Sequence, residues 1–483
     1  MLCRYHLAPG GQHCKAIAVN KPLGVWCFPR LPGRLKSLTQ QAGNGFPDGG
    51  ALHLRNLARL KQNIGFKIKG CSHCGIISSL HQTSKVPSPI YLMNPLNLPK
   101  GIRSRLVNNI NGLAMHVLEA GFERTSKGEA KGRILLLHGF PELAFSWRKL
   151  MLPLAQAGYH VIAPDQRGYG QTTGWDGRYD GDVASFRPLN LVQDALALVN
   201  AVGWHSVSAV VGHDFGSPVA AWCALVRPDV FRSVVMMSAP FAGPPALAFD
   251  TAKDASEGSA DATKTAALSA WSGSRLHDDL ATLPRPRKHY QWYYSTREAD
   301  GDMRHAPQGI HAFMRAYYHY KSADWKANRP FKLRDASAAE LAKMPTYYLM
   351  DLHEDMAKTV SHEMPTASEI AQCQWLPDNE LSVYSAAFAR TGFQGPLNWY
   401  RCSTSDVLNA DLKLFSGRTI DVPSCFIAGA SDWGIYQKPG VFEAMQQTAC
   451  TQMAGCHLVE GAGHWVQQEQ PRAVFHLLLA FLG

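Results

Sequence analysis

Short apolar runs alternate with longer amphipathic segments from about residue 106 onward. The apolar runs are bounded by Gly, Pro and Asp, and this pattern predicts strands. They lie at residues 114–120, 134–137, 160–163, 207–211, 233–237, 424–428 and 457–459. Apolar positions three and four residues apart predict helices at 189–202, 218–226 and 472–482. Strands that alternate with helices favour an α/β fold with a mainly parallel, doubly wound sheet, which binds ligands at the carboxyl ends of its strands.

This alternation stops between residues 243 and 403, where aromatic and charged residues are dense and strand-like runs are absent. The segment predicts a largely helical cap that is inserted into the α/β core and covers an apolar pocket. We therefore expect residues 93–242 and 404–483 to form the core and residues 243–403 to form the cap.

Residues 1–92 differ in composition from the rest of the 483-residue chain. They hold 12 Lys and Arg against Asp48 as the single acidic residue, whereas the remainder holds 36 Lys and Arg against 37 Asp and Glu. Without sustained periodicity, this extension is expected to be disordered, or to be non-native sequence upstream of a start at Met93. A targeting segment is the third alternative. The net charge of +10 belongs to the extension, and no recognition module accompanies it, so no nucleic-acid partner is expected.

The 11 cysteines follow no spacing that indicates a disulfide framework. This favours a reducing compartment, with the cytoplasm as the expected location. No apolar run approaches the roughly 18 residues of a membrane span, so the sequence predicts none.

The strongest chemical signal is an apolar strand that runs into Gly212-His213-Asp214-Phe215-Gly216 and then into a helix. Gly-x-Asp-x-Gly in this context matches the nucleophile elbow, in which the flanking glycines permit a tight turn. A carboxylate raised at such a turn can attack an electrophilic carbon and form an ester. An Asp that merely caps the helix is the alternative, but the partner residues below favour a nucleophile.

A second signal follows the strand at 134–137, where His138, a glycine, Phe140 and Pro141 come in succession. In this type of fold, the N–H after such a His-Gly pair and the N–H after the nucleophile form an oxyanion hole. The expected donors are the amides of Phe140 and Phe215, because Pro141 has no N–H. We expect His138 to be structural.

Two late loops supply the partners that a nucleophilic Asp214 needs. Asp432 follows the strand at 424–428, and His464 stands in a Gly-rich loop after the last predicted strand. Nucleophile, acid and histidine thus come in the order along the chain that this type of fold uses. We expect His464 to act as the base and Asp432 to orient it.

An Asp nucleophile restricts the reaction. Esterases and acyltransferases use Ser or Cys at the elbow, whereas a carboxylate suits displacement at saturated carbon, which leaves an alkyl ester for water to cleave. Epoxides and alkyl halides both fit. An epoxide oxygen becomes an alkoxide and needs an acid, while a halide needs only N–H donors.

Several motifs from residue 102 to the C-terminus resemble the soluble epoxide hydrolase family. They are HGFP at 138–141, GHDFG at 212–216, GAGHW at 461–465, HYQWYY at 289–294 and GFQGPLNWYR at 392–401. The resemblance implies an α/β-hydrolase fold with a helical cap, and it makes Tyr290 and Tyr400 the donors to the epoxide oxygen. We also expect Trp147, Trp292 and Trp399 to bind the substrate. In the elbow, this chain has Phe215 and Ser217 where many relatives have Trp and Gly.

The resemblance further implies a two-step conversion of an epoxide into a vicinal diol. Asp214 forms an alkyl ester, which water activated by His464 then hydrolyses. A small apolar epoxide and water are the expected partners, and neither a metal nor an organic cofactor is implied.

Two alternatives remain open. A haloalkane or haloacid dehalogenase also uses an Asp nucleophile, but such relatives typically have Trp or Arg where this chain has Phe215, and Phe140 lacks a halide-binding amide side chain. A non-catalytic binding protein on the same scaffold is the second alternative, because a fold alone does not establish function. The presence of nucleophile, base, acid and both tyrosines argues against it.

Overall fold

The computed structural model describes residues 98–123, 128, 130–247 and 274–483. The prediction for residues 1–92, and the part of the predicted cap at 248–273, lie outside these residues. Among the helices that the described residues form, none combines the length and the apolar composition that a membrane crossing requires.

The described residues contain an eight-stranded sheet in the order β1-β2-β4-β3-β5-β6-β9-β10. In this order, the pairs β1–β2 and β2–β4 are antiparallel. All pairs of neighbours from β4 to β10 are parallel. The strands are β1 (Ile102–Ile110), β2 (Leu113–Ala120), β3 (Gly132–Leu137), β4 (Tyr159–Pro164), β5 (Ala209–His213), β6 (Val234–Met237), β9 (Ser424–Gly429) and β10 (Met453–Val459). The predicted mainly parallel, doubly wound sheet is confirmed.

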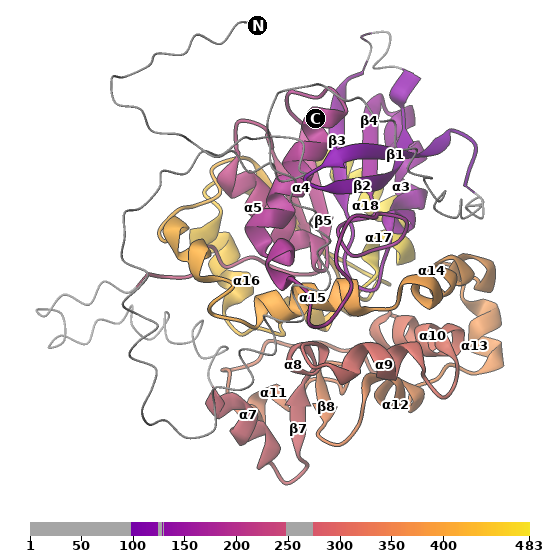
Figure 1. Cartoon of the computed structure of the whole chain (residues 1–483), viewed down its shortest axis with the longest axis vertical. Helices are drawn as coiled ribbons and strands as arrows, with labels where there is room; N and C mark the ends of the chain where they lie inside the picture. The colour runs from indigo at the N-terminus through magenta and orange to yellow at the C-terminus, as the bar shows by residue number, and fades with distance from the viewer. Residues whose placement is uncertain (1–97, 124–127, 129, 248–273) are drawn as a thin grey trace, which may run out of the picture. The chain divides into compact units, whose positions relative to one another are not determined.

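Helices cover both faces of this sheet (Figure 1). Successive residues of β5 point to opposite faces, so that Val210 belongs to one apolar core and Val211 to the other. The first core includes side chains of α4 and α5, and the second includes side chains of α3 and α18. These helices and the two short ones near the C-terminus are α3 (Arg148–Gln156), α4 (Pro188–Ala201), α5 (Gly216–Val226), α16 (Val441–Ala444), α17 (Val466–Glu469) and α18 (Pro471–Leu482).

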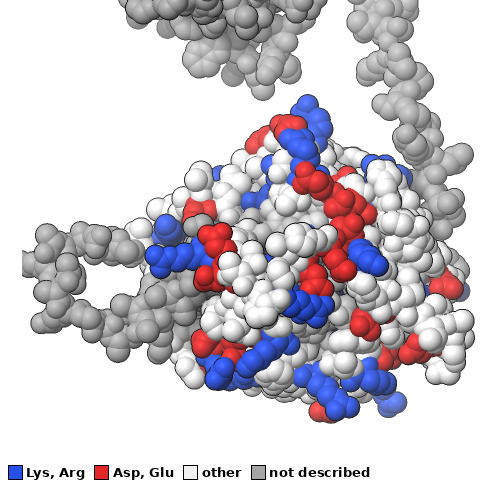
Figure 2. Space-filling view, turned by 90° about the horizontal axis from the view of Figure 1, so that it is seen from below, with Lys and Arg blue, Asp and Glu red and all other residues white. Residues whose placement is uncertain are grey.

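A layer made mostly of helices is inserted between β6 and β9, next to the ends of the strands that carry the candidate site (Figure 1). Its helices are α7 (Ser274–Ala281), α8 (Tyr290–Tyr294), α9 (Glu298–Arg304), α10 (Ile310–Lys321), α11 (Ala338–Leu341), α12 (Met356–Ser361), α13 (Ala367–Gln372), α14 (Asp378–Thr391) and α15 (Gln394–Ser403). On the face seen from this side, Lys and Arg are interspersed with Asp and Glu (Figure 2). This face therefore offers no extended basic patch for a nucleic acid.

The expectation that the insertion has no strands is wrong. Strands β7 (Arg287–His289) and β8 (Leu349–Asp351) pair antiparallel across it. With three residues each, they are too short to give an alternating pattern. Strand β1 was not predicted either, because it is an edge strand with five of its nine residues exposed and only Ile102, Val107 and Ile110 buried.

The turn from β5 into α5 forms a crowded elbow. Asp214 has a φ of 51°, in the left-handed region that few non-glycine residues adopt. A Cβ atom on Gly212 would lie 2.0 Å from the Gly216 carbonyl oxygen, and a Cβ atom on Gly216 would lie 2.3 Å from the Leu137 carbonyl oxygen. The two glycines are therefore required for β5, α5 and the end of β3 to approach one another this closely.

Gly216→Ala should lower the free energy of unfolding by about 1–3 kcal/mol or more, because its methyl group would overlap the backbone of β3. The matched control is Gly301→Ala in α9, where an added Cβ meets no atom within 4 Å. This control should stabilise the protein by about 0.5–1 kcal/mol, as alanine does within a helix. Denaturant unfolding of both variants checks the difference, and equal stabilities would contradict the crowded elbow.

Candidate active site

Three loops at the carboxyl ends of parallel strands carry the residues predicted as nucleophile, acid and base. Asp214 directly follows β5, Asp432 follows β9, and His464 follows β10. His464 Nε2 lies 3.0 Å from Asp214 Oδ2, and His464 Nδ1 lies 3.1 and 3.2 Å from the two carboxylate oxygens of Asp432. The structure therefore brings together three residues that are up to 250 positions apart in the sequence.

Each oxygen of the Asp214 carboxylate accepts one hydrogen bond. The Phe140 N–H donates to Oδ1 over 2.8 Å, and His464 Nε2 donates to Oδ2. Burial alone would raise the pKa of Asp214, but the hydrogen bond and charge of His464, together with the charges of Lys321 and His213, bring this pKa below its ordinary value. The carboxylate is thus ionised at neutral pH, as a nucleophile must be.

Asp432 is almost completely buried, with 2% of its surface exposed. It accepts a hydrogen bond of 2.7 Å from the Gly434 N–H in addition to its contact with His464 Nδ1. Burial raises its pKa, but the charge and hydrogen bond of His464 outweigh this effect, so the pKa of Asp432 lies below its ordinary value. An ionised Asp432 fixes the orientation of the His464 ring and stabilises its protonated form.

The two predicted oxyanion donors differ in whether they form a hydrogen bond to Asp214. The Phe140 amide points at Asp214 Oδ1, as described above. The Phe215 amide lies at the start of α5 and makes no hydrogen bond to Asp214 within the described part of the chain. Only one of the two donors is therefore engaged in the absence of a substrate, and donors of this kind often align only once the reaction begins.

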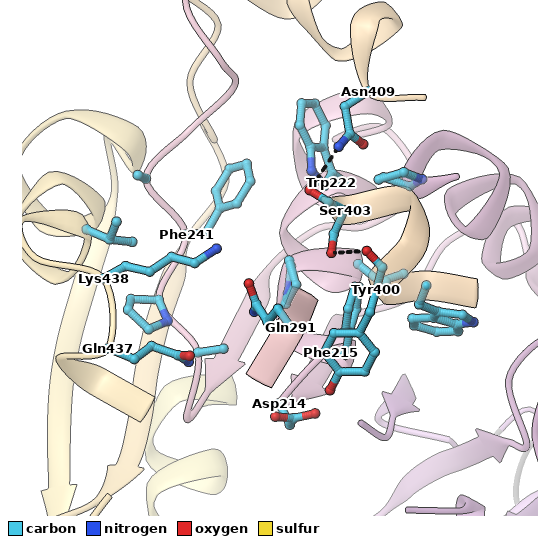
Figure 3. Close-up of a pocket in the computed structure, with 18 of the residues that line it drawn as sticks. Asp214, Phe215, Trp222, Phe241, Gln291, Tyr400, Ser403, Asn409, Gln437 and Lys438 are labelled. Atoms are coloured by element: carbon cyan, nitrogen blue, oxygen red, sulfur yellow. Dashed lines mark hydrogen bonds between the residues drawn. The ribbon is translucent and has the colours of Figure 1, made fainter. Parts of the chain in front are cut away.

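A cavity of about 320 Å³ extends from Asp214 between the core and the inserted layer. In Figure 3, Asp214 lies at one end, and Phe215 and Tyr400 rise beside it toward Trp222 and Phe241. Most of the wall is apolar or aromatic, and the polar side chains of Gln291, Ser403, Asn409, Gln437 and Lys438 are spread along it. A small apolar molecule fits such a site.

Tyr290 and Tyr400 both line this cavity, with ring centroids 6.0 Å apart. The Tyr290 hydroxyl donates to Gln437 Oε1 and accepts from Gln291 Nε2, each over 3.2 Å. The Tyr400 hydroxyl has no hydrogen bond to any described residue and is therefore available to a ligand. Burial, and then the charge of Asp214, raise the pKa of both phenols well above 10, so both remain proton donors.

Of the three tryptophans expected to bind the substrate, only Trp399 lines the cavity. Its indole N–H donates to the Arg167 carbonyl oxygen. Trp147 is completely buried in the core on the opposite face of the sheet, because the short helix Ala144–Trp147 turns away from the cavity. Trp292 packs between His277 and His289 on the far side of α8. The expectations for Trp147 and Trp292 do not fit these positions.

A buried ion pair that was not predicted connects the loop after β3, the elbow and the His464 loop. His213 Nδ1 donates to Glu142 over 2.6 Å, and its Nε2 donates to the His464 carbonyl oxygen over 2.7 Å. Burial lowers the pKa of His213, but the charge and hydrogen bond of Glu142 outweigh this effect, so the pKa lies above its ordinary value and the protonated form is favoured. Both residues stand beside predicted ones in the sequence, yet only the folded chain shows that they meet.

A second carboxylate, that of the partly buried Glu469, holds the His464 loop. It accepts hydrogen bonds of 2.8–2.9 Å from the N–H groups of Gly463, Trp465 and Ala323. Two of these donors flank His464, and the third belongs to the segment after α10. The His464 N–H itself donates to the Lys321 carbonyl oxygen over 2.9 Å. The end of α10 is thus fastened to the catalytic loop through main-chain groups, which leave no sequence signal.

Lys321 places a buried positive charge near this centre. Only 3% of its surface is exposed, and its Nζ lies 5.1–5.9 Å from the ring centroids of Tyr317, Tyr347, Tyr348 and Trp465. Burial lowers the pKa of Lys321, and the charges of Asp214 and Asp432 oppose that change. In return, its charge helps to keep both carboxylates ionised.

Comparison with known proteins identifies relatives that span most of the chain. Residues 132–471 match the family model of the α/β hydrolase fold. The chain is 30% identical to epoxide hydrolase B of Mycobacterium tuberculosis over 355 residues, which is 72% of this chain and 91% of that protein. It is 31% identical to epoxide hydrolase A of the same organism over 386 residues, which is 78% of this chain and 96% of that protein.

Solved structures give the same result. An epoxide hydrolase from an endophytic Streptomyces superposes with a TM-score of 0.60 at 29% identity, covering 80% of this chain and 96% of that chain. Epoxide hydrolase A from Mycobacterium thermoresistibile superposes with a TM-score of 0.57 at 29% identity, covering 79% and 98%.

Glu469→Gln should lower the free energy of unfolding by about 1–3 kcal/mol, because an amide has one oxygen and leaves a buried N–H without its acceptor. The matched control is Glu443→Gln, which removes a surface ion pair with Lys332 and should cost about 0–1 kcal/mol. Denaturant unfolding measures both changes. If both substitutions cost the same, the role of Glu469 in fastening the loop is refuted.

Proposed function

This chain belongs to the α/β-hydrolase fold family and is an epoxide hydrolase, and on this premise we propose that it opens epoxides through an ester on Asp214. Residues 93–242 and 404–483 form the core that carries the triad, and residues 243–403 form the cap that carries Tyr290 and Tyr400. The substrate is a small apolar epoxide, which occupies the cavity beside Asp214, and water is the second reactant.

In the first step, Asp214 Oδ2 attacks one carbon of the epoxide ring and forms a carbon–oxygen bond. The ring bond from this carbon to the epoxide oxygen breaks, and the oxygen keeps the electron pair. Tyr290 and Tyr400 donate their hydroxyl groups to this oxygen, and one of them supplies its proton. The free hydroxyl of Tyr400 and the raised pKa of both phenols support this role.

Once the ester has formed, Asp214 no longer accepts from His464 Nε2, and the proton on this nitrogen returns through water to the tyrosinate left by the first step. In the second step, the neutral His464 Nε2 takes a proton from water while the water oxygen attacks the ester carbon of Asp214. The negative charge collects on Oδ1, to which the Phe140 amide already donates, and the Phe215 amide becomes the second donor. The ester bond then breaks, and the oxygen that leaves takes the proton of the new Asp214 carboxyl group. The diol departs, which leaves Asp214 ionised and His464 protonated, as at the start. Asp432 stabilises the protonated His464.

The observation that carries this proposal is that the two carboxylate oxygens of Asp214 have different hydrogen-bond partners. Oδ1 accepts from a backbone amide and Oδ2 from His464. A carboxylate that only capped a helix would accept from the amides of its own helix, yet the side chain of Asp214 accepts from Phe140, 74 residues earlier.

His464→Gln tests the proposed order of steps. An amide cannot accept a proton from water, so hydrolysis of the ester should slow by about 10²–10⁴-fold while Asp214 can still attack. Incubation with styrene oxide should therefore give a protein whose intact mass has increased by one epoxide, with the addition located on the Asp214 peptide. Asp214→Asn is the matched control and should take up no epoxide.

If His464→Gln forms diol at the wild-type rate, or if the adduct lies on another residue, the ester mechanism is wrong. Release of halide from a haloalkane by the wild-type protein, without formation of diol from any epoxide, would instead assign the chain to dehalogenation.

The raised pKa of the two phenols predicts the pH dependence of the first step. A phenol of ordinary pKa near 10 loses half of its donor form at pH 10. Because the pKa of Tyr290 and of Tyr400 lies well above this value, the donor form persists, and the single-turnover alkylation rate should stay constant from pH 7 to pH 10. Tyr400→Phe should lower this rate by about 10²–10⁴-fold. A fall to half the rate near pH 10 would contradict the assignment.

A further inference from the structure

Asp214 lies at one end of the cavity (Figure 3). Beyond the nucleophile, its wall comes from α4, α5 and residues 239–243 of the core, from α8 and α15 of the inserted layer, and from residues 434–441. Figure 3 shows Asp214 at one end of this space and Trp222, Phe241 and Lys438 farther along it. A substrate that reacts at Asp214 therefore has room for a substituent on this side.

Asp214 also adjoins an aromatic wall outside the cavity, which we define as Phe140, Tyr294, Tyr317 and Phe393. Each of these residues is at most 1% exposed, and none of them lines the cavity. The ring centroid of Phe140 lies 5.1 Å from that of Tyr294 and 6.2 Å from those of Tyr317 and Phe393. Rings at these distances are in direct contact, so no space remains between them.

The aromatic wall adjoins the reacting groups. The Phe140 N–H donates to Asp214, and the ring of Tyr294 lies 5.0 Å from the ring of Tyr400. Burial raises the pKa of Tyr294 and of Tyr317, and the charge of Asp214 adds to both increases. These two phenols therefore lie within the electrostatic reach of Asp214, although neither lines the cavity.

We propose that this enzyme acts on epoxides that carry all their carbon substituents on one ring carbon, and that it discriminates against trans-disubstituted epoxides. The two ring carbons of an epoxide are adjacent, and trans substituents on them point in opposite directions. When one substituent occupies the cavity, the other meets the aromatic wall. This inference rests on the proposed function and adds the substrate class to it.

The cost of a second substituent follows from the packing. Additional carbon atoms in a filled aromatic cluster force the rings from their positions, which is unfavourable in well-packed interiors. We expect kcat/KM for a trans-disubstituted epoxide to be about 100-fold or more below that for a terminal epoxide of similar hydrophobicity.

The first experiment compares styrene oxide with trans-stilbene oxide and trans-β-methylstyrene oxide on the wild-type protein, with diol formation as the readout. Turnover of styrene oxide with at least 100-fold lower kcat/KM for both trans epoxides supports the inference. Values within about threefold of each other overturn it and leave the proposed function intact. No diol from any of the three overturns the proposed function together with the inference.

A pair of variants on one helix tests whether the aromatic wall is the cause. Tyr317→Ala removes a ring of the aromatic wall and should raise the ratio of trans-β-methylstyrene oxide to styrene oxide turnover about tenfold. Tyr320→Ala removes an equally buried ring of α10 that packs against Trp325 and Tyr347 instead, and it should leave the ratio unchanged. An unchanged ratio in a folded Tyr317→Ala protein, or an equal change in both variants, overturns the role of the wall. The wild-type comparison decides the substrate class even if a variant does not fold.

Discussion

The carboxylate of Asp214 accepts one hydrogen bond on each oxygen, and most features of the site depend on this arrangement. Oδ1 receives the Phe140 amide and Oδ2 receives His464. To present both oxygens in this way, Asp214 adopts a left-handed conformation between two glycines that admit no side chain. Glu142 and His213 then join the loop after β3, the elbow and the backbone of His464. The elbow and the Glu142–His213 ion pair together fix the position of the Asp214 oxygens, on which the negative charge develops in the proposed reaction.

The site also depends on the balance of buried charge. An isolated buried ion is unfavourable by several kcal/mol, so buried carboxylates require cationic or N–H partners. Asp432 and Glu142 are buried, Asp214 is partly buried, and all three are ionised, with His213, His464 and Lys321 among them. Lys321 comes from the inserted layer rather than from the sheet. So does Ala323, whose N–H is one of the three donors to Glu469. The inserted layer therefore contributes to the electrostatic environment of the candidate site and also lines part of its cavity.

Much of this organisation follows from the sequence, and the exceptions have physical reasons. The parallel strands β3, β4, β5, β6 and β9 are mostly buried and apolar, and they were predicted, whereas the edge strand β1, with five of its nine residues exposed, was not. Asp214, Asp432 and His464 were predicted as nucleophile, acid and base, because each lies near glycines in a turn that follows a predicted strand. Glu142, Glu469 and Lys321 have no such signal, because their partners are mostly main-chain groups or lie far away in the chain. Trp147 and Trp292 were expected to bind the substrate, but neither lines the cavity, and Trp147 belongs to the core on the other face of the sheet.

The central claim is that the oxygen added to the epoxide comes from Asp214 and is replaced by water. A single turnover of styrene oxide by excess enzyme in H₂¹⁸O, followed by mass analysis of the diol and of the Asp214 peptide, tests this most directly. The account predicts an unlabelled diol and one ¹⁸O atom in the Asp214 carboxylate. A labelled diol with an unlabelled Asp214 would show that water attacks the epoxide itself, and it would contradict the account.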